Sequence, residues 1–145
     1  KVSFYLTGPG SIFEFHEDTS VSLKATKKGP LAGLLFFEDQ GVPFSFGFRP
    51  KHLIRFNHDE LPTDLRLHRI SSNNARTLLG TIYAPKSVLL VNANAPVADA
   101  SAYTAIIVGR LWLRKGPVLT LNAKYTETEV PVPGGLIRAQ SVIVK

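Results

Sequence analysis

The sequence lacks both cysteine and methionine across its 145 residues. Without cysteine, the chain has no disulfide framework, no thiolate-ligated zinc site and no thiol nucleophile. A reading frame begins with methionine, so we expect a processed product or an expressed fragment whose neighbouring segments are missing. Long apolar runs are lacking too, and no stretch of this sequence is expected to cross a bilayer.

Charged residues are scarce, at 19% against 44% hydrophobic, and this balance favours one folded domain over disorder. Basic residues number 17 and acidic residues 11, for a net charge of +6, which would favour a polyanion as partner if the charge were clustered. It is scattered, so we expect mostly solvated strand edges and turns. The densest basic groups are Lys24, Lys27 and Lys28; Arg49 and Lys51; Arg66 and Arg69; and Arg110, Arg114 and Lys115.

Short β-branched and aromatic runs, bounded by Gly, Pro, Asn and Asp, recur along the whole chain, whereas helical periodicity is almost absent. This pattern predicts an all-β protein. A helical turn is conceivable only at 73–79. The expected strands are 2–6, 11–15, 21–25, 34–37, 53–56, 65–70, 81–84, 88–91, 105–108, 111–113, 118–121 and 136–144.

Internal similarity indicates how these strands are arranged. Segment 80–86 resembles 104–110 at an offset of 24, segment 33–36 resembles 80–83 at an offset of 47, and 11–15 resembles 33–37 at an offset of 22. A period in the low twenties, with several short strands in each unit, is the size of one β-solenoid coil. We therefore expect a single-domain right-handed parallel β-helix over residues 1–145, with an insertion near 42–65. A β-sandwich or jelly roll is the alternative, although two-residue Asn-Gly or Asp-Gly hairpin turns are missing.

Five residues are expected to form structural turns. Gly33 and Gly80 open the repeated segments, and Asn92, Asn94 and Asn122 follow strongly apolar strands. Asn tolerates left-handed backbone geometry and bonds its own backbone, so it suits the corners of stacked coils.

No catalytic or metal-binding set stands out. The clusters 16–18 and 58–60, each a His followed by two acidic residues, match neither a closed zinc site nor a calcium loop. Nucleophile-elbow, phosphate-loop and dinucleotide motifs are missing. We therefore expect no catalytic residue, no metal and no cofactor, and a protein that is not an enzyme.

Carboxylate pairs are the remaining route to chemistry, because glycoside hydrolysis needs two acids at a defined separation. The candidates are Glu14, Glu17, Asp18, Glu38 and Asp39. The offset of 22 would bring Glu14 close to Asp39.

Binding candidates gather late in the chain, at Arg110, Trp112, Arg114 and Lys115. Trp112 lies between two leucines and faces the side opposite to them. It is a candidate stacking platform for a sugar or a base, and an aromatic that covers a strand edge is the alternative.

Several strings resemble the extracytoplasmic region of bacterial TadE/TadG-like proteins of Flp (Tad) pilus assembly. They are FYLTG at 4–8, IFEF at 12–15, PLAGLLFFED at 30–39, RISSNNARTLLGTIYAP at 69–85, SAYTAI at 101–106, LTLNAKY at 119–125 and VPVP at 130–133. The resemblance covers most of the chain and is weakest across 42–65. It implies a bacterial envelope or surface protein anchored by an N-terminal membrane helix outside this sequence.

The expected function is a non-enzymatic extracytoplasmic structural or interaction module, in the periplasm or at the cell surface, associated with pilus assembly or adhesion. Its partners would be envelope or pilus-related proteins or surface polysaccharide, without specific nucleic acid binding. Two alternatives stay open: a polysaccharide-binding or polysaccharide-processing β-helix protein, and a polyanion-binding module. Because the ends of a solenoid are open sheet edges, we also expect homo-oligomers formed through them.

Overall fold

The computed structural model describes residues 1–41 and 66–134. The described elements are strands β1 (Phe4–Leu6), β2 (Glu14–Phe15), β3 (Ser20–Lys24), β4 (Leu34–Glu38), β5 (Arg66–Ile70), β6 (Asn74–Val91) and β7 (Thr104–Leu113), and one short 3-10 helix, η2 (Tyr125–Glu127). The all-β composition predicted from the short apolar runs is thus found in this part of the chain. The expected insertion, the cluster 58–60, Arg49, Lys51 and the expected strands 53–56 and 136–144 lie outside the described residues.

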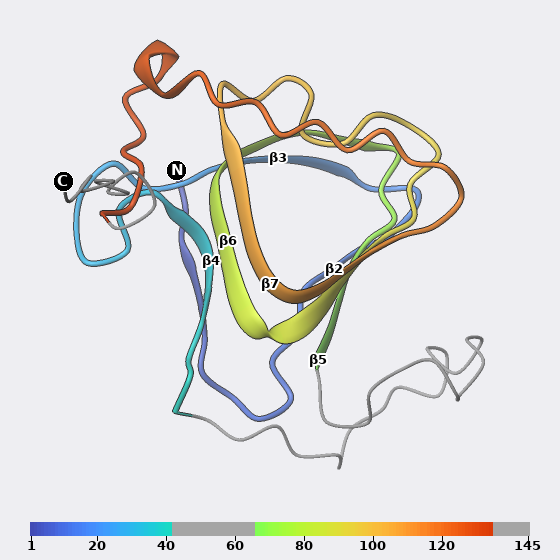
Figure 1. Cartoon of the computed structure of the whole chain (residues 1–145), viewed down its shortest axis with the longest axis horizontal. Helices are drawn as coiled ribbons and strands as arrows, with labels where there is room; N and C mark the ends of the chain where they lie inside the picture. The colour runs from blue at the N-terminus through green and yellow to red at the C-terminus, as the bar shows by residue number, and fades with distance from the viewer. Residues whose placement is uncertain (42–65, 135–145) are drawn as a thin grey trace, which may run out of the picture.

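The sheet is built around β6, which has 18 residues. One edge of β6 pairs in turn with β3, β4 and β5, and its other edge pairs with β7. Strands β1 and β2 add to β4 and β5. Every one of these pairs is parallel. Figure 1 shows β6 and β7 bending together around a corner of a roughly triangular outline.

The expected right-handed parallel β-helix is wrong. The strands form one seven-stranded sheet that curls into an open half-barrel. Along one side of the molecule the later passes of the chain form no strand, and isolated bridges join Val97 to Leu119 and Tyr103 to Ala123. Asn92, Asn94 and Pro96 come directly before the first of these passes, and they disfavour a strand there because Asn favours turns and Pro donates no ladder hydrogen bond. The β-sandwich alternative is also wrong for the described residues, whose named strands pair in parallel within a single sheet.

Two of the three predicted registers are confirmed. The offset of 24 pairs Gly80 with Thr104 in β6 and β7. The offset of 47 pairs Leu34 with Thr81, and it shortens by one residue at a bulge further along β4.

The offset of 22 is wrong, because Glu14 pairs with Arg69 on β5 and not with β4. The free edge of β4 is taken by β1, where Phe4 lies opposite Phe36. The helical turn considered at 73–79 is wrong as well, since most of that segment opens β6.

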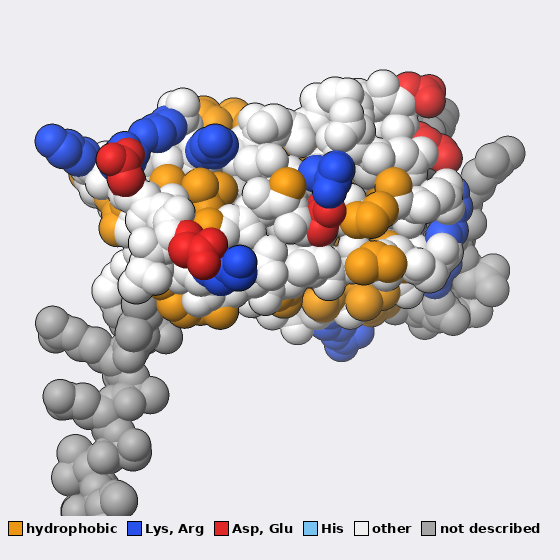
Figure 2. Space-filling model, turned by 90° about the horizontal axis from the view of Figure 1, so that it is seen from above, with side chains coloured by type: hydrophobic (Ala, Val, Ile, Leu, Met, Phe, Trp, Pro, Cys, Tyr) orange, Lys and Arg blue, Asp and Glu red, His pale blue; other side chains and the backbone are white. Residues whose placement is uncertain are grey.

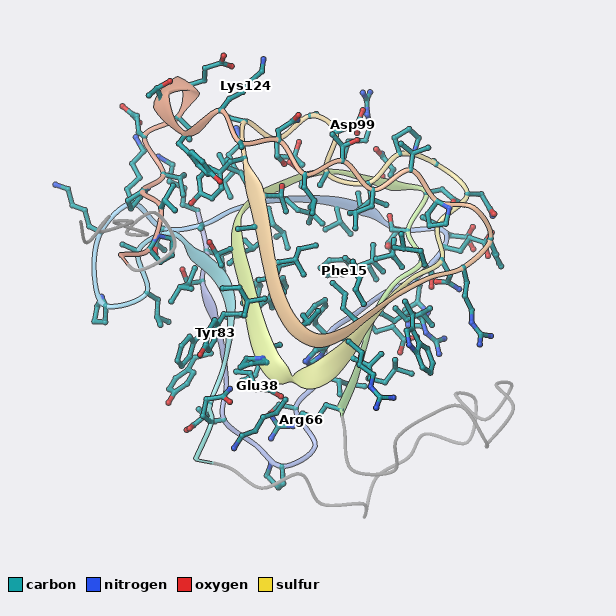
Figure 3. The ribbon with its side chains drawn as sticks, in the orientation of Figure 1. Phe15, Glu38, Arg66, Tyr83, Asp99 and Lys124 are labelled. Carbon is teal, nitrogen blue, oxygen red and sulfur yellow. The ribbon has the colours of Figure 1, made fainter. Side chains whose placement is uncertain are left out.

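Aromatic rings form the centre of the core. Phe13 stacks on Phe36 with ring centroids 4.1 Å apart and on the imidazole of His68 at 4.4 Å. Around them pack fully buried aliphatic side chains such as Ile82 and Leu89, and each such side chain stabilises the fold by about 1.5–3 kcal/mol. Figure 3 shows Phe15 pointing into the same interior.

Both predicted glycine turns are places of close approach. Gly33 has φ 79°, and a Cβ there would lie 2.0 Å from the carbonyl oxygen of Pro131. Gly80 has φ 136° and lies at a bend within β6, where a Cβ would come within 2.7 Å of Ala25 Cβ. Tyr103 reinforces the first contact, because its hydroxyl donates to the Pro131 carbonyl at 2.6 Å, and burial raises the pKa of Tyr103 to about 12.

The three predicted asparagines hold corners through side-chain hydrogen bonds. Asn92 Oδ1 accepts from the Ser71 hydroxyl, Asn94 Nδ2 donates to Glu17 Oε1, and Asn122 Nδ2 donates to the carbonyls of Asp99 and Ser101. The left-handed backbone expected of these asparagines is not observed. Among the described non-glycine residues it occurs at Ala98 and Lys115.

Candidate functional site

Four polar side chains are enclosed at one corner of the curled sheet, and we call them the buried polar cluster: Glu38, Arg66, His68 and Ser87. They come from the end of β4, from β5 and from the middle of β6, where Arg66 lies opposite Ser87. Each is at most 2% exposed. Figure 3 shows Glu38 and Arg66 together at this corner.

Glu38 is the acceptor on which the buried polar cluster depends. Its Oε1 accepts from Arg66 Nη1 at 2.7 Å and from the Ser87 hydroxyl at 2.5 Å, and its Oε2 accepts from the Lys86 backbone N–H at 3.1 Å. The second terminal nitrogen of Arg66 donates to the Gly8 carbonyl at 3.2 Å. Charge-assisted hydrogen bonds of this kind compensate for removing the carboxylate from water.

His68 is neutral at physiological pH. The pKa of His68 is lowered to about 4, mainly by burial; the Glu38 charge opposes this change and the Arg66 charge adds to it. Its Nδ1 accepts the backbone N–H of Phe13 at 3.2 Å. Within the described part of the chain, His68 Nε2 and Arg66 Nε have no hydrogen-bond partner.

The buried polar cluster is suited to holding strands together. Its charges are enclosed and compensated, so its contacts fix β4 against β5 and β6 instead of meeting a substrate. A single sequence signal pointed towards it, the carboxylate of Glu38. In β5, Leu67 alternates with Arg66 and His68, and this pattern by itself does not indicate that the two polar side chains face inward.

The carboxylate pair considered for glycoside hydrolysis does not form. Glu14 is ion-paired with Arg69 at 3.2 Å, whereas Asp39 accepts the hydroxyl hydrogen bond of Tyr5 at 3.0 Å. That hydrogen bond raises the pKa of Tyr5. The two acids therefore serve separate structural contacts.

The outer face of the sheet carries a second ordered set, which we call the aromatic column: Tyr5, Phe37, Tyr83 and Ile107. Strand pairing places these side chains in register across β1, β4, β6 and β7. The ring centroids of Phe37 and Tyr83 are 5.3 Å apart and nearly parallel, and those of Tyr5 and Phe37 are 5.5 Å apart. Figure 3 shows Tyr83 projecting away from the interior.

Beside the aromatic column lies a hollow of about 290 Å³, which we call the apolar slot. Its volume is near the lower limit for small-molecule pockets. It is lined by Leu34, Phe37, Thr81, Tyr83, Ile107, Pro133 and Gly134.

The predicted binding residues lie at the end of β7 and in the turn after it, where Trp112 and Arg114 come into contact. The guanidinium carbon of Arg114 lies 5.7 Å from the centre of the Trp112 ring. Trp112 sits opposite the buried Leu90, on the outer face. Arg110, which precedes this pair in the sequence, and Lys115, which follows it, are both exposed.

Three other basic side chains within residues 1–41 and 66–134 have structural partners elsewhere. Arg66 is buried, Arg69 is paired with Glu14, and Lys27 forms an ion pair with Glu129. Figure 2 shows basic and acidic side chains interspersed on the face it presents. Arg76 forms an ion pair with Asp99, and the hydrogen bonds from Arg76 lower the pKa of the Asp99 carboxyl.

The acidic turn at 16–18 connects β2 to β3, where Glu17 bonds Asn94 as described above. Over residues 1–41 and 66–134, no three His, Cys, Asp or Glu side chains are grouped closely enough to hold a metal ion. Nor does this part of the chain contain a helix with the length and apolar character needed to cross a membrane.

Comparisons of the chain with protein-family models, with curated proteins and with solved structures found no match in any of the three. The resemblance to TadE/TadG-like proteins therefore stays a prediction.

Proposed function

We propose that this protein is a non-enzymatic interaction module that binds an apolar side chain of a partner protein in the apolar slot. The observation that carries the proposal is the slot itself, an apolar hollow on the outer face of β4, β6 and β7. The resemblance stated above supports an extracytoplasmic setting, in pilus assembly or in adhesion at a bacterial surface.

The aromatic column favours a protein partner over a polysaccharide. A sugar binds an aromatic ring through the face of the ring, but Phe37 and Tyr83 already stack on each other. Together with Ile107 and Pro133 they line the apolar slot. An apolar lining of this kind suits the insertion of a partner's Leu, Phe or Trp side chain.

The placement of the polar groups supports binding as the role of the molecule. Glu38 and Arg66 are enclosed and bonded to each other, and Glu14 and Asp39 each have a structural partner. On the outer face of the sheet, the apolar slot lies apart from these polar contacts, as does the pair of Trp112 on β7 and Arg114 just after it.

The test is an NMR titration of the methyl-labelled protein with two panels of ligands. One panel contains short peptides with a central Leu, Phe or Trp, and the other contains neutral and acidic oligosaccharides. We expect the peptides to shift the Ile107 and Leu34 methyl signals. Ile107→Glu should weaken peptide binding about tenfold or more, because it places a charge in the slot.

Leu67→Glu is the matched control, since Leu67 is a half-buried residue on β5, outside the residues that line the slot. It should leave peptide binding unchanged. Oligosaccharides that shift the slot signals while peptides do not would favour the polysaccharide-binding alternative. No shift from either panel would contradict the proposal.

A further inference from the structure

The described sheet has two free edges at its opposite ends: β7 forms one edge, and β1 and β2 form the other. Among residues 1–41 and 66–134, β7 pairs only with β6, while β1 and β2 pair only with β4 and β5. Such edges present unpaired N–H and C=O groups that can accept another strand.

The two edges match in register. One column of strands runs β1, β4, β6, β7, with Phe4, Phe36, Ile82 and Ile106 in line. A neighbouring column runs β2, β5, β6, β7, and it ends at residues 110–113. A second copy can therefore be placed beyond β7, with its β1 beside the first half of β7 and its β2 beside the second half. Both new strand pairs would be parallel, like every pair within the sheet.

Apolar side chains are left uncovered at both edges. Leu89 and Val91 of β6 are fully buried, but their partners on β7, Leu111 and Leu113, are 41% and 51% exposed. At the other edge, Phe4 is 40% exposed although its partner Phe36 is only 2% exposed. Each of these exposed side chains is thus the strand partner of a buried core residue.

The charges at the two edges are complementary. The turn after β2 carries Glu17 and Asp18, and the turn after β7 carries Lys115. These turns lie at the same corner, since Phe15 pairs with Ile70, Ile70 with Val91 and Val91 with Leu113. In a shifted copy the acidic turn of one molecule would meet Lys115 in the basic turn of the next.

From these observations we infer that the chain binds a second copy of itself head to tail, with β1 and β2 of one copy continuing the sheet of the next beyond β7. The contact is heterologous, so it repeats and builds a linear assembly. Four strands per copy at about 4.8 Å give a rise of about 19 Å per molecule. Ile107, which lines the apolar slot, would lie beside Tyr5 of the neighbouring copy. The charge-swap variants below leave every slot residue unchanged, so failure of this inference would leave the proposed function standing.

The test is a charge-swap experiment followed by sedimentation velocity over a wide range of concentrations. One variant carries Lys115→Glu, and the other carries Glu17→Lys and Asp18→Lys. Each variant alone places like charges at the contact, and its self-association should weaken at least about tenfold. An equimolar mixture restores opposite charges at every contact and should associate as the wild type does.

Lys86→Glu is the control, because it changes an exposed charge halfway along the stack. It should associate like the wild type, and circular dichroism of every variant checks that it is folded. A wild type that stays monomeric up to about 1 mM would overturn the inference. Normal association of the Glu17→Lys, Asp18→Lys variant would also overturn it, since this result indicates a symmetric contact through β7 alone. A mixture of the two variants that fails to associate like the wild type would overturn it as well.

Discussion

Removing one partner of the buried Glu38 and Arg66 ion pair should destabilise the protein severely. Arg66→Met keeps most of the side-chain volume and deletes the charge. Glu38 then remains buried with hydrogen bonds from the Ser87 hydroxyl and the Lys86 backbone N–H, but with no countercharge. The reverse variant, Glu38→Gln, leaves the arginine charge uncompensated.

The magnitude follows from the burial of both groups. Glu38 is 0% exposed and Arg66 2%, so solvent cannot take over from the missing partner. Breaking a pair of this kind costs about 3–5 kcal/mol, which is a large share of a folding stability of about 5–15 kcal/mol. The double variant Glu38→Gln, Arg66→Met removes both charges, and it should be more stable than either single variant.

Urea unfolding followed by circular dichroism and Trp112 fluorescence measures these free energies. If a single variant is unfolded in the absence of urea, recovery of structure in the double variant still tests the coupling. A free energy of unfolding for Arg66→Met within about 1 kcal/mol of the wild type would refute the reasoning, because the arginine charge would then not be compensating a buried carboxylate.

Three further predictions concern single positions. The folded pKa of His68 is about 4, below its ordinary 6.5. The contribution of the neutral His68 side chain to the free energy of unfolding is therefore complete above pH 6.5 and is lost as pH falls towards 4. The loss should reach about 3 kcal/mol, and His68→Asn should show a correspondingly smaller loss in urea titrations at pH 7 and pH 4. Gly33→Ala should lower the melting temperature more than Gly29→Ala, because both glycines have positive φ but only Gly33 has Pro131 within reach of a Cβ; equal losses would contradict the packing described. Tyr83→Ala should cost about 1–3 kcal/mol through the lost stacking on Phe37 and lost burial, whereas Tyr83→Phe should be nearly neutral in thermal unfolding.

The sequence was informative about strand pairing where the repeated segments are strongly apolar. The matches of 80–86 to 104–110 and of 33–36 to 80–83 each predicted a parallel pair that is found. It was misleading where a strand is very short. β2 has two residues, so its similarity to β4 carried little register information, and β1 took the edge of β4 instead.

The buried polar cluster could not be predicted because its members are far apart in the chain. Glu38 and Arg66 are 28 residues apart, and an apolar alternation cannot show that an arginine faces inward when its partner lies on another strand. The apolar slot has a similar origin, since Pro133 reaches Leu34 only after the chain has passed through β6 and β7. The parallel β-helix was predicted from the repeat period and from the missing hairpin turns, and neither indicates whether the side at 92–103 can form strands.

The most direct test of the account is the order of side chains along the column Phe4, Phe36, Ile82 and Ile106. In NOE spectra of protein labelled at isoleucine methyls and aromatic rings, the Ile82 methyls should show contacts both to the Phe36 ring and to the Ile106 methyls. Cross-strand contacts of an antiparallel pattern, or Ile82 contacts to only one of these neighbours, would contradict the parallel sheet built around β6.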